Sequence, residues 1–361
     1  MKEFYEKVTR PCRKISDFFL LSALLSLVLI IIGEIISSAA FNYLNIQDKL
    51  ISWSGSDNVG TFLGDYLGTF GVWIAFLLFA VIFKSNRPML KALAPNKSLN
   101  NLKGILLGLL LGFGTNGFCV LMSWLTGDIK LSYNGFDWKL LIAFLICVFI
   151  QSSSEEVADR LYLYQKLRRR YRSPLVAIFI NSIVFMALHM ANPGFTAIAG
   201  SQIFLVAIIF SLFVYYYDGI WVAFWFHAAW NYTQNIIFGL PNSGIISEYS
   251  IFRLEAASAR NGLFYNVNFG VEGSVGSSLV LVVVIVVMII INRKKHEKRD
   301  YWAEAEKAAA EKNDMMTTAK HAGLISDRYS YKYNERSRKK QWIAGGCKPR
   351  PAEEIQICAY S

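Results

Sequence analysis

Apolar stretches of roughly 20 residues recur along the chain, the length at which a helix crosses the hydrocarbon core of a bilayer. Membrane-spanning β-strands would be shorter and would alternate apolar with polar residues, which these stretches do not. The pattern therefore predicts an all-α, polytopic membrane protein with about eight transmembrane helices. The predicted spans are residues 18–41, 61–83, 104–125, 138–164, 174–190, 196–216, 220–240 and 275–291.

The basic residues of the short connecting segments alternate from one side of the predicted spans to the other. Clusters of Lys and Arg occupy residues 2–14, 84–103, 166–172 and 293–299, whereas the segments between these clusters hold few basic residues. Because cytoplasmic loops carry the excess of Lys and Arg, both termini are predicted to face the cytoplasm. That placement requires an even number of spans, which agrees with the count of eight.

Composition divides the chain into an N-terminal cytoplasmic segment at 1–17, a membrane domain at 18–291 and a basic tail at 292–361. In the tail, the run WAEAEKAAAEK predicts a short exposed helix, followed by disorder. The net charge of +11 divides into +5 for residues 1–291 and +6 for the tail. The charges of the loops orient the spans, and the basic tail can contact anionic lipid. These two roles account for the net charge, so no nucleic-acid partner is expected.

Two short patterns give only weak signals. The last four residues, 358–361, fit the C-a-a-X prenylation pattern, although chance explains a four-residue match more simply. The cysteines lack the spacing of a zinc site or a disulfide framework, and we predict that they are unpaired. They are Cys12, Cys119, Cys147, Cys347 and Cys358.

Glycines recur at four-residue intervals in the second and third spans. This spacing favours close packing of helices. The two series are Gly60, Gly64 and Gly68, and Gly104, Gly108 and Gly112.

The fourth span contains charged residues that a bilayer should exclude. Charges inside the membrane are costly and usually functional. Neighbouring side chains of a helix point about 100° apart, so Glu156 is predicted to pair with Arg160 one turn later while Glu155 points elsewhere. Glu155 is therefore left without a partner on its own helix.

Two histidines fall inside spans, His189 in the fifth and His227 in the seventh, with Asn231 one turn after His227 on the same face. A turn at Pro174 would join the fourth and fifth spans as an antiparallel hairpin. Glu155 and His189 then reach nearly equal depth. We predict that these groups converge in the cytoplasmic half of the membrane, although each histidine alone could equally serve as a structural hydrogen-bonding group.

A carboxylate, two imidazoles and a carboxamide can together hydrolyse an acyl bond. Desolvation would make Glu155 a better base towards a bound water. The amide of Asn231 can donate to the oxyanion of a tetrahedral intermediate, with His227 as a second donor or acid. Peptide-bond hydrolysis is the simplest reaction of this kind.

Three segments resemble the EExxxR, FxxxH and HxxxN motifs of the CPBP family, the CAAX-protease and bacteriocin-processing intramembrane endopeptidases, also called Abi proteins. They are EEVADR at 155–160, FMALH at 185–189 and HAAWN at 227–231, in that order within about 138–240. The resemblance implies a multi-pass endopeptidase of the cell membrane whose cavity opens to the cytoplasm. Its substrate would be a membrane-associated peptide or protein of CAAX-type, prenylated-like or bacteriocin type.

The resemblance also assigns roles to six residues. The water would be activated by Glu155 with help from His189, the oxyanion would be stabilised by His227 and Asn231, and the site would be supported by Glu156 and Arg160. The family was long described as metalloproteases, so zinc held by Glu155, His189 and His227 is an alternative. A metal-free glutamate mechanism without a cofactor is favoured, because no HExxH helix is present.

Other functions stay open at this point. A non-catalytic immunity or scaffold protein could retain the same motifs. A proton-coupled transporter could use the membrane carboxylates as a relay, although no matching halves are found. Glu34, Asp65 and Asn116, outside the motifs, fit interhelical hydrogen bonds and a cavity lining equally well. No oligomeric state is predicted.

Overall fold

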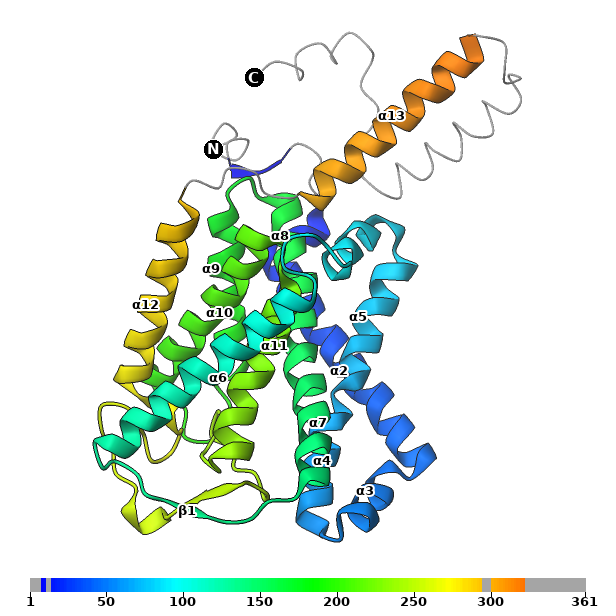
Figure 1. Cartoon of the computed structure of the whole chain (residues 1–361). Helices are drawn as coiled ribbons and strands as arrows, with labels where there is room; N and C mark the ends of the chain where they lie inside the picture. The colour runs from blue at the N-terminus through cyan, green and yellow to red at the C-terminus, as the bar shows by residue number, and fades with distance from the viewer. Residues whose placement is uncertain (1–7, 11–13, 294–299, 322–361) are drawn as a thin grey trace.

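The structure, a computed structural model, describes residues 8–10, 14–293 and 300–321 and is mostly helical (Figure 1). Among these residues, six helices are long and apolar enough to cross a membrane. They are α2 (Phe19–Leu44), α4 with α5 (Asp57–Ile82), α6 (Leu102–Leu125), α7 through η3 to α8 (Trp138–Arg170), α10 (Ala197–Tyr217) and α12 (Val275–Asn292). The prediction of a helical multi-pass membrane protein is confirmed at this level.

All eight predicted spans are helical, but two of them are shorter than a full crossing. The fifth is α9 (Pro174–Leu188), which begins at the predicted proline. The seventh is α11 (Ile220–Asn231), which continues into a π-helical turn, η4 (Tyr232–Ile237). The exact number of eight crossings and the cytoplasmic position of both termini therefore stay predictions.

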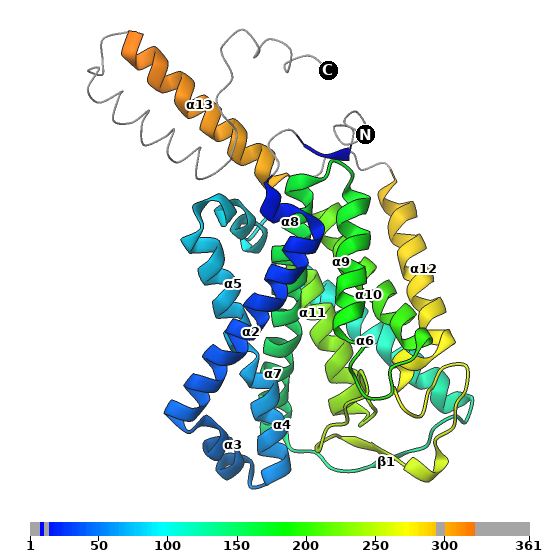
Figure 2. The ribbon, with the colours of Figure 1, turned by 180° about the vertical axis from the view of Figure 1, so that it is seen from behind.

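The centre of the bundle is α11, which packs against α6, α7 and α10, while α9 and α12 cover α10. A Cβ atom on Gly108 would lie 2.7 Å from the backbone oxygen of Val222, and one on Gly112 would lie 2.4 Å from that of Phe226. The two glycines thus allow α6 to approach α11 closely, as their spacing predicts. Seen from behind, α2 runs obliquely across the bundle (Figure 2), where it packs against α5 (Phe70–Ile82) and η3 (Val157–Leu163).

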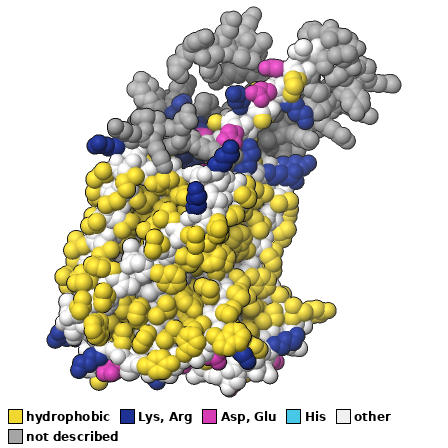
Figure 3. Space-filling view, viewed as in Figure 1, with side chains coloured by type: hydrophobic (Ala, Val, Ile, Leu, Met, Phe, Trp, Pro, Cys, Tyr) yellow, Lys and Arg dark blue, Asp and Glu magenta, His cyan; other side chains and the backbone are white. Residues whose placement is uncertain are grey.

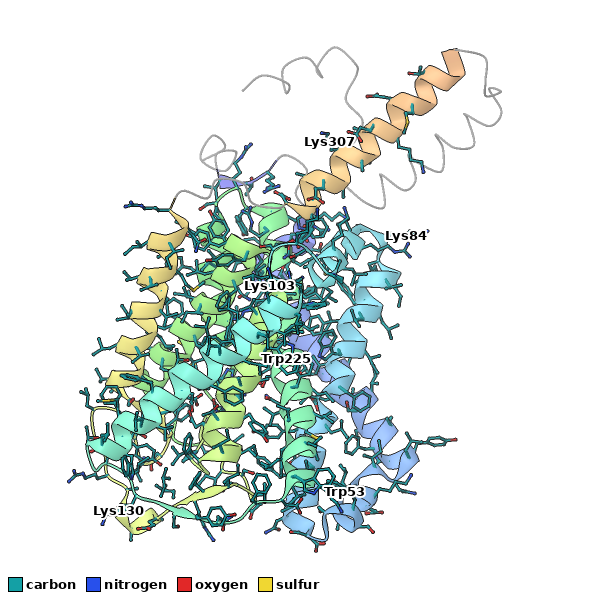
Figure 4. All side chains as sticks on the ribbon, in the orientation of Figure 1. Trp53, Lys84, Lys103, Lys130, Trp225 and Lys307 are labelled. Carbon is teal, nitrogen blue, oxygen red and sulfur yellow. The ribbon has the colours of Figure 1, made fainter. Side chains whose placement is uncertain are left out.

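Charge separates the two ends of the bundle from its middle. Figure 3 shows a broad hydrophobic zone on one face, with Lys and Arg at both ends of it. Lys84 and Lys103 lie at the end from which α13 (Tyr301–His321) projects, and Lys130 lies at the opposite end (Figure 4). The described basic residues within 84–103 and 166–172, which the loops predict to be cytoplasmic, lie at the α13 end.

The first turn of α13 differs from the exposed helix predicted for this segment. Tyr301 and Trp302 are only 3% and 5% exposed. The indole Nε1 of Trp302 donates to the backbone oxygen of Gln165 at 2.9 Å, and the Arg169 guanidinium lies 4.3 Å from the ring centre. The helix also continues to His321, past the predicted run. The aromatic pair anchors this end of the helix on α8 (Tyr164–Arg170).

Some predicted features lie outside the described residues: Cys12, Cys347, the tail beyond residue 321 and the terminal C-a-a-X pattern. Of the described cysteines, Cys119 and Cys147 are buried free thiols.

A buried charge cluster ties the segment before α2 to α8. Asp17, in η1 (Ile15–Asp17), is fully buried and forms ion pairs with Arg169 and, at 2.5 Å, with the Nζ of Lys166. Burial alone would raise the pKa of Asp17, but the hydrogen bonds and charges of Arg169 and Lys166 outweigh it and hold that pKa below its usual value.

This cluster predicts an acid-sensitive contribution to stability. A carboxyl with a lowered folded pKa stabilises the protein fully above its unfolded value, about 3.9, and loses that contribution as the pH falls through the folded value. Asp17→Asn should therefore lower the stability of the protein at neutral pH. Below about pH 4, the stability of the variant should fall less steeply with pH than that of the wild type. Unfolding midpoints of both proteins in detergent across this range test the prediction, and parallel curves would contradict it.

The end opposite α13 is closed by a long loop, residues 238–274, without regular structure over most of its length. Its strand β2 (Phe252–Leu254) pairs antiparallel with β1 (Leu131–Tyr133), the segment that joins α6 to α7. Near its end the loop forms a single 3-10 turn, η6 (Val271–Gly273), directly before α12. Nothing in the hydrophobic pattern predicts this structure.

Candidate active site

A cavity of about 450 Å³ lies among α2, α4 (Asp57–Gly68), α7 (Trp138–Glu156), α9 and α11. The loops that follow α9 and η4 complete its wall. Its polar and charged lining includes Glu34, Asp65, Gln151, Glu155, Asp159, His189, Asn192, His227, Asn231, Asn242 and Ser243. Four of the six predicted site residues therefore face one cavity, and the other two, Glu156 and Arg160, lie behind it.

Glu155 is the carboxylate of this cavity that faces both imidazoles. Its Oε1 accepts a hydrogen bond from the Nε2 of Gln151, one turn earlier. Its Oε2 lies 3.7 Å from the Nε2 of His189 and 3.9 Å from the Nε2 of His227. This Oε2 is buried and has no hydrogen-bond partner among the described residues. One carboxylate oxygen is thus held by its own helix, and the other is free to accept a proton.

Hydrogen bonds at Nδ1 orient both imidazoles. The Nδ1 of His189 lies 2.8 Å from the backbone oxygen of Phe185, which can only accept, so Nδ1 carries the proton and a neutral His189 has its lone pair on Nε2. The Nδ1 of His227 lies 3.0 Å from Oε1 of Glu156. Each histidine therefore presents its Nε2 to Glu155 and the cavity.

Glu156 and Arg160 form the predicted pair at i+4. Arg160 Nη1 donates to Glu156 Oε1 at 3.1 Å, and neither side chain is exposed. Arg160 also donates to the backbone oxygen of Ala207 at 3.1 Å, and its guanidinium lies 4.5 Å and 5.1 Å from the ring centres of Phe185 and Phe210. The pair connects α7 to α9 and α10 behind the cavity and supports His227 from that side.

Two π-helical segments begin directly after motif residues. The first, η3, follows Glu155 and Glu156, and the second, η4, follows Asn231. Such segments are rare and are frequent at functional sites, because the wider turn redirects side chains and frees backbone groups. In η3, the Nδ2 of Asn181 donates to the backbone oxygen of Asp159 at 2.9 Å. The widened turn is thus held by a side chain from α9.

Asn231 lines the same cavity as Glu155, and both the NH₂ group and the oxygen of its amide form hydrogen bonds. Its Nδ2 donates to the Oγ of Ser152 at 3.1 Å and lies 3.4 Å from the Oε1 of Gln151. Its Oδ1 accepts from the Nδ2 of Asn242 at 3.1 Å. The amide hydrogens are therefore directed towards the helix that carries Glu155.

Sequence reasoning missed several residues of the site. Gln151 could have been found, since it lies one turn before Glu155 on the same helix face. Asn242 and Ser243, in the long loop, carry no such signal. The structure also separates the three undecided residues: Glu34 and Asp65 line the cavity, whereas Asn116 donates from its Nδ2 to Gln234 at 2.7 Å and joins two helices.

The zinc alternative depends on Glu155, His189 and His227. Within the described ranges, no group of three or more His, Cys, Asp or Glu side chains has the arrangement of a metal site. The two Nε2 atoms nevertheless face the same carboxylate oxygen, where either a water or an ion could be held. The metal-free glutamate mechanism therefore stays a prediction, with zinc as its alternative.

Comparison with known proteins identifies the segment that carries these residues. No match was found among curated proteins or solved structures. Residues 137–233, however, match the protein family described as type II CAAX prenyl endopeptidase Rce1-like. The matched segment runs from the residue before α7 into η4 and includes all three motifs. The resemblance is thus confirmed, and residues 137–233 form a domain of the Rce1-like family of type II CAAX prenyl endopeptidases, within the CPBP proteases.

Proposed function

We propose that this protein is an intramembrane endopeptidase in which Glu155 activates the attacking water. One observation carries the proposal: the unpartnered Oε2 of Glu155 faces the Nε2 atoms of His189 and His227 inside the cavity. A water held there would lie within reach of a carboxylate and an imidazole, both able to accept its proton.

In the proposed reaction, Glu155 accepts a proton from the water while the water oxygen bonds to the carbonyl carbon of the substrate. The Nε2 of His189 accepts a hydrogen bond from the same water and keeps it in place. The resulting oxyanion is stabilised by the amide hydrogens of Asn231, and by His227 when its Nε2 carries a proton. The C–N bond then breaks, and Glu155 returns its proton to the leaving amine.

The proposed substrate is a peptide or protein attached to the membrane. The matched family favours a prenylated C-a-a-X sequence, and a bacteriocin-type peptide is the second class to test. We also propose that the α13 end faces the cytoplasm, because the described basic residues within 84–103 and 166–172 lie at that end. An impermeant thiol reagent should then fail to label Lys84→Cys, an exposed position at this end, in intact cells, and labelling from outside would overturn this orientation.

Cleavage of defined peptides tests the activity. The purified protein in detergent should release the last three residues of a farnesylated peptide that ends in C-a-a-X, detected by mass spectrometry, or should cut a bacteriocin-type precursor. A folded protein that cuts neither class would overturn the proposal and favour the non-catalytic immunity or scaffold role.

The same assay decides whether the reaction needs a metal. We expect the cleavage rate to be unchanged after treatment with EDTA and 1,10-phenanthroline, with less than stoichiometric zinc in elemental analysis. Loss of activity on chelation, restored by zinc, would establish the metalloprotease alternative.

A further inference from the structure

Glu272 is a buried carboxylate outside the motifs and outside the family match. It lies in η6, directly before α12, and is only 5% exposed. Its Oε1 accepts from the Nε1 of Trp230 at 2.8 Å and from the Nδ2 of Asn242 at 3.1 Å. Its Oε2 accepts from the backbone N–H of Ser243 at 2.5 Å and lies 3.2 Å from the Oγ of Ser243. Hydrogen-bond donors thus surround both of its oxygens.

The donors around Glu272 determine which way the amide of Asn242 points. The Oε1 of Glu272 accepts from the indole N–H of Trp230, which can only donate, and Asn242 turns its NH₂ group towards the same accepting oxygen. The same NH₂ group has a second hydrogen, which is donated to the Oδ1 of Asn231 at 3.1 Å. Asn242 therefore bridges the carboxylate of Glu272 to the carboxamide of Asn231.

The orientation of Asn242 in turn determines that of Asn231. If the Asn231 amide were reversed, its NH₂ would face the NH₂ of Asn242, and its oxygen would face the Oε1 of Gln151. Both contacts would be between like groups and would lose their hydrogen bonds. With Asn242 held by Glu272, the NH₂ of Asn231 is directed towards Gln151 and Ser152 on α7, the helix that carries Glu155.

Backbone geometry holds Glu272 close to this loop. Gly270 has φ +76°, a left-handed conformation that favours glycine. A Cβ atom there would lie 2.1 Å from the backbone oxygen of Pro241, at the start of the loop that carries Asn242. The turn before α12 thus packs directly against the loop, and only a residue without a side chain fits at Gly270.

We propose that Glu272 is a positioning residue of the protease, which acts through Asn242 to hold the Asn231 amide with its hydrogens towards the oxyanion. This inference rests on the proposed function. It extends the site beyond the matched segment, since the residue that orients the oxyanion donor comes from the loop before the last helix.

Glu272→Gln tests the positioning role, because the new amide keeps the shape of the side chain but offers a donor in place of one acceptor. We expect kcat to fall about 10-fold to 100-fold with KM within about twofold, somewhat less than the loss of a complete oxyanion donor. Glu255→Gln, the same change at an exposed position of the same loop, should leave both constants unchanged. Unchanged kcat in Glu272→Gln would overturn the proposal.

A double-mutant cycle separates positioning from a general loss of stability. In an Asn231→Ala background, Glu272→Gln should reduce kcat little further, because the group that it orients is already missing. If the two losses multiply, Glu272 acts independently of Asn231 and the proposal is wrong. Should Glu272→Gln fail to fold, Asn242→Ala gives the same comparison while leaving Glu272 its other donors.

A second readout needs no substrate and distinguishes this inference from the proposed function. The Tm shifts of Glu272→Gln and Asn231→Ala should be non-additive in the double variant, because one hydrogen-bonded chain connects the two residues. If wild type cleaves nothing but this coupling is present, the proposed function fails and the hydrogen-bonded chain stands. Additive Tm shifts would show that no hydrogen-bonded chain couples the two residues, whether or not the protein is a protease.

Discussion

Replacing Glu155 by glutamine is expected to reduce peptide cleavage by about a hundred- to ten-thousand-fold, the usual contribution of a general base. The amide of glutamine keeps the size of the side chain and an oxygen that can accept from Gln151, so the fold should be preserved. It cannot accept a proton from water at neutral pH. The loss should therefore appear in kcat, measured by product release, with little change in KM.

Two comparisons make this test specific. Glu248→Gln, at an exposed position of the long loop, should cleave at the wild-type rate. Glu156→Gln should reduce both stability and activity, because Glu156 holds Arg160 and His227 together. If Glu155→Gln retains a third or more of the wild-type cleavage rate, Glu155 is not the general base.

Replacing Arg160 by alanine is expected to cost about 3–5 kcal/mol of folding free energy, the typical penalty for removing one partner of a buried ion pair. Glu156 would keep a buried charge with only His227 beside it. The contacts of the guanidinium with Phe185 and Phe210 would be lost as well. Arg160→Lys should recover only part of this loss, because lysine lacks the planar fork that stacks between the rings.

Unfolding by denaturing detergent in mixed micelles measures this effect. Arg260→Ala is a suitable control, since Arg260 is largely exposed and its pair with Asp128 spans 3.4 Å. Its removal should change the free energy of unfolding by less than about 1 kcal/mol. Equal unfolding midpoints for the two variants would show that the buried pair does not stabilise the fold.

The parts of the site that could be predicted from the sequence depend on helical periodicity. The pairing of Glu156 with Arg160 follows from a four-residue spacing, and the proximity of Glu155 to His189 follows from a hairpin that turns at Pro174. These relations depend only on the rise and repeat of a helix. They hold wherever the segment is regular, which is why these two spacings agree with the contacts in the structure.

The other parts of the site and fold depend on tertiary contacts that helical periodicity does not predict. Glu272 reaches Asn242 and Trp230 because an irregular loop folds back on the bundle, and its acidic side chain looks like that of any exposed loop residue. The buried first turn of α13 was missed for a related reason. Trp302 begins a run with the composition of an exposed helix, and its burial depends on where Gln165 and Arg169 lie in space.

The lining of the cavity has an electrostatic consequence for what can enter it. Its charged residues are all acidic: Glu34, Asp65, Glu155 and Asp159 line it, and no Lys or Arg of the described chain does. Such a field concentrates cations and basic segments of a peptide and repels free carboxylates, more strongly at low ionic strength. A substrate that presents its own C-terminal carboxylate would therefore have to direct it away from Glu34 and Asp65, and basic residues next to the scissile bond would ease its entry.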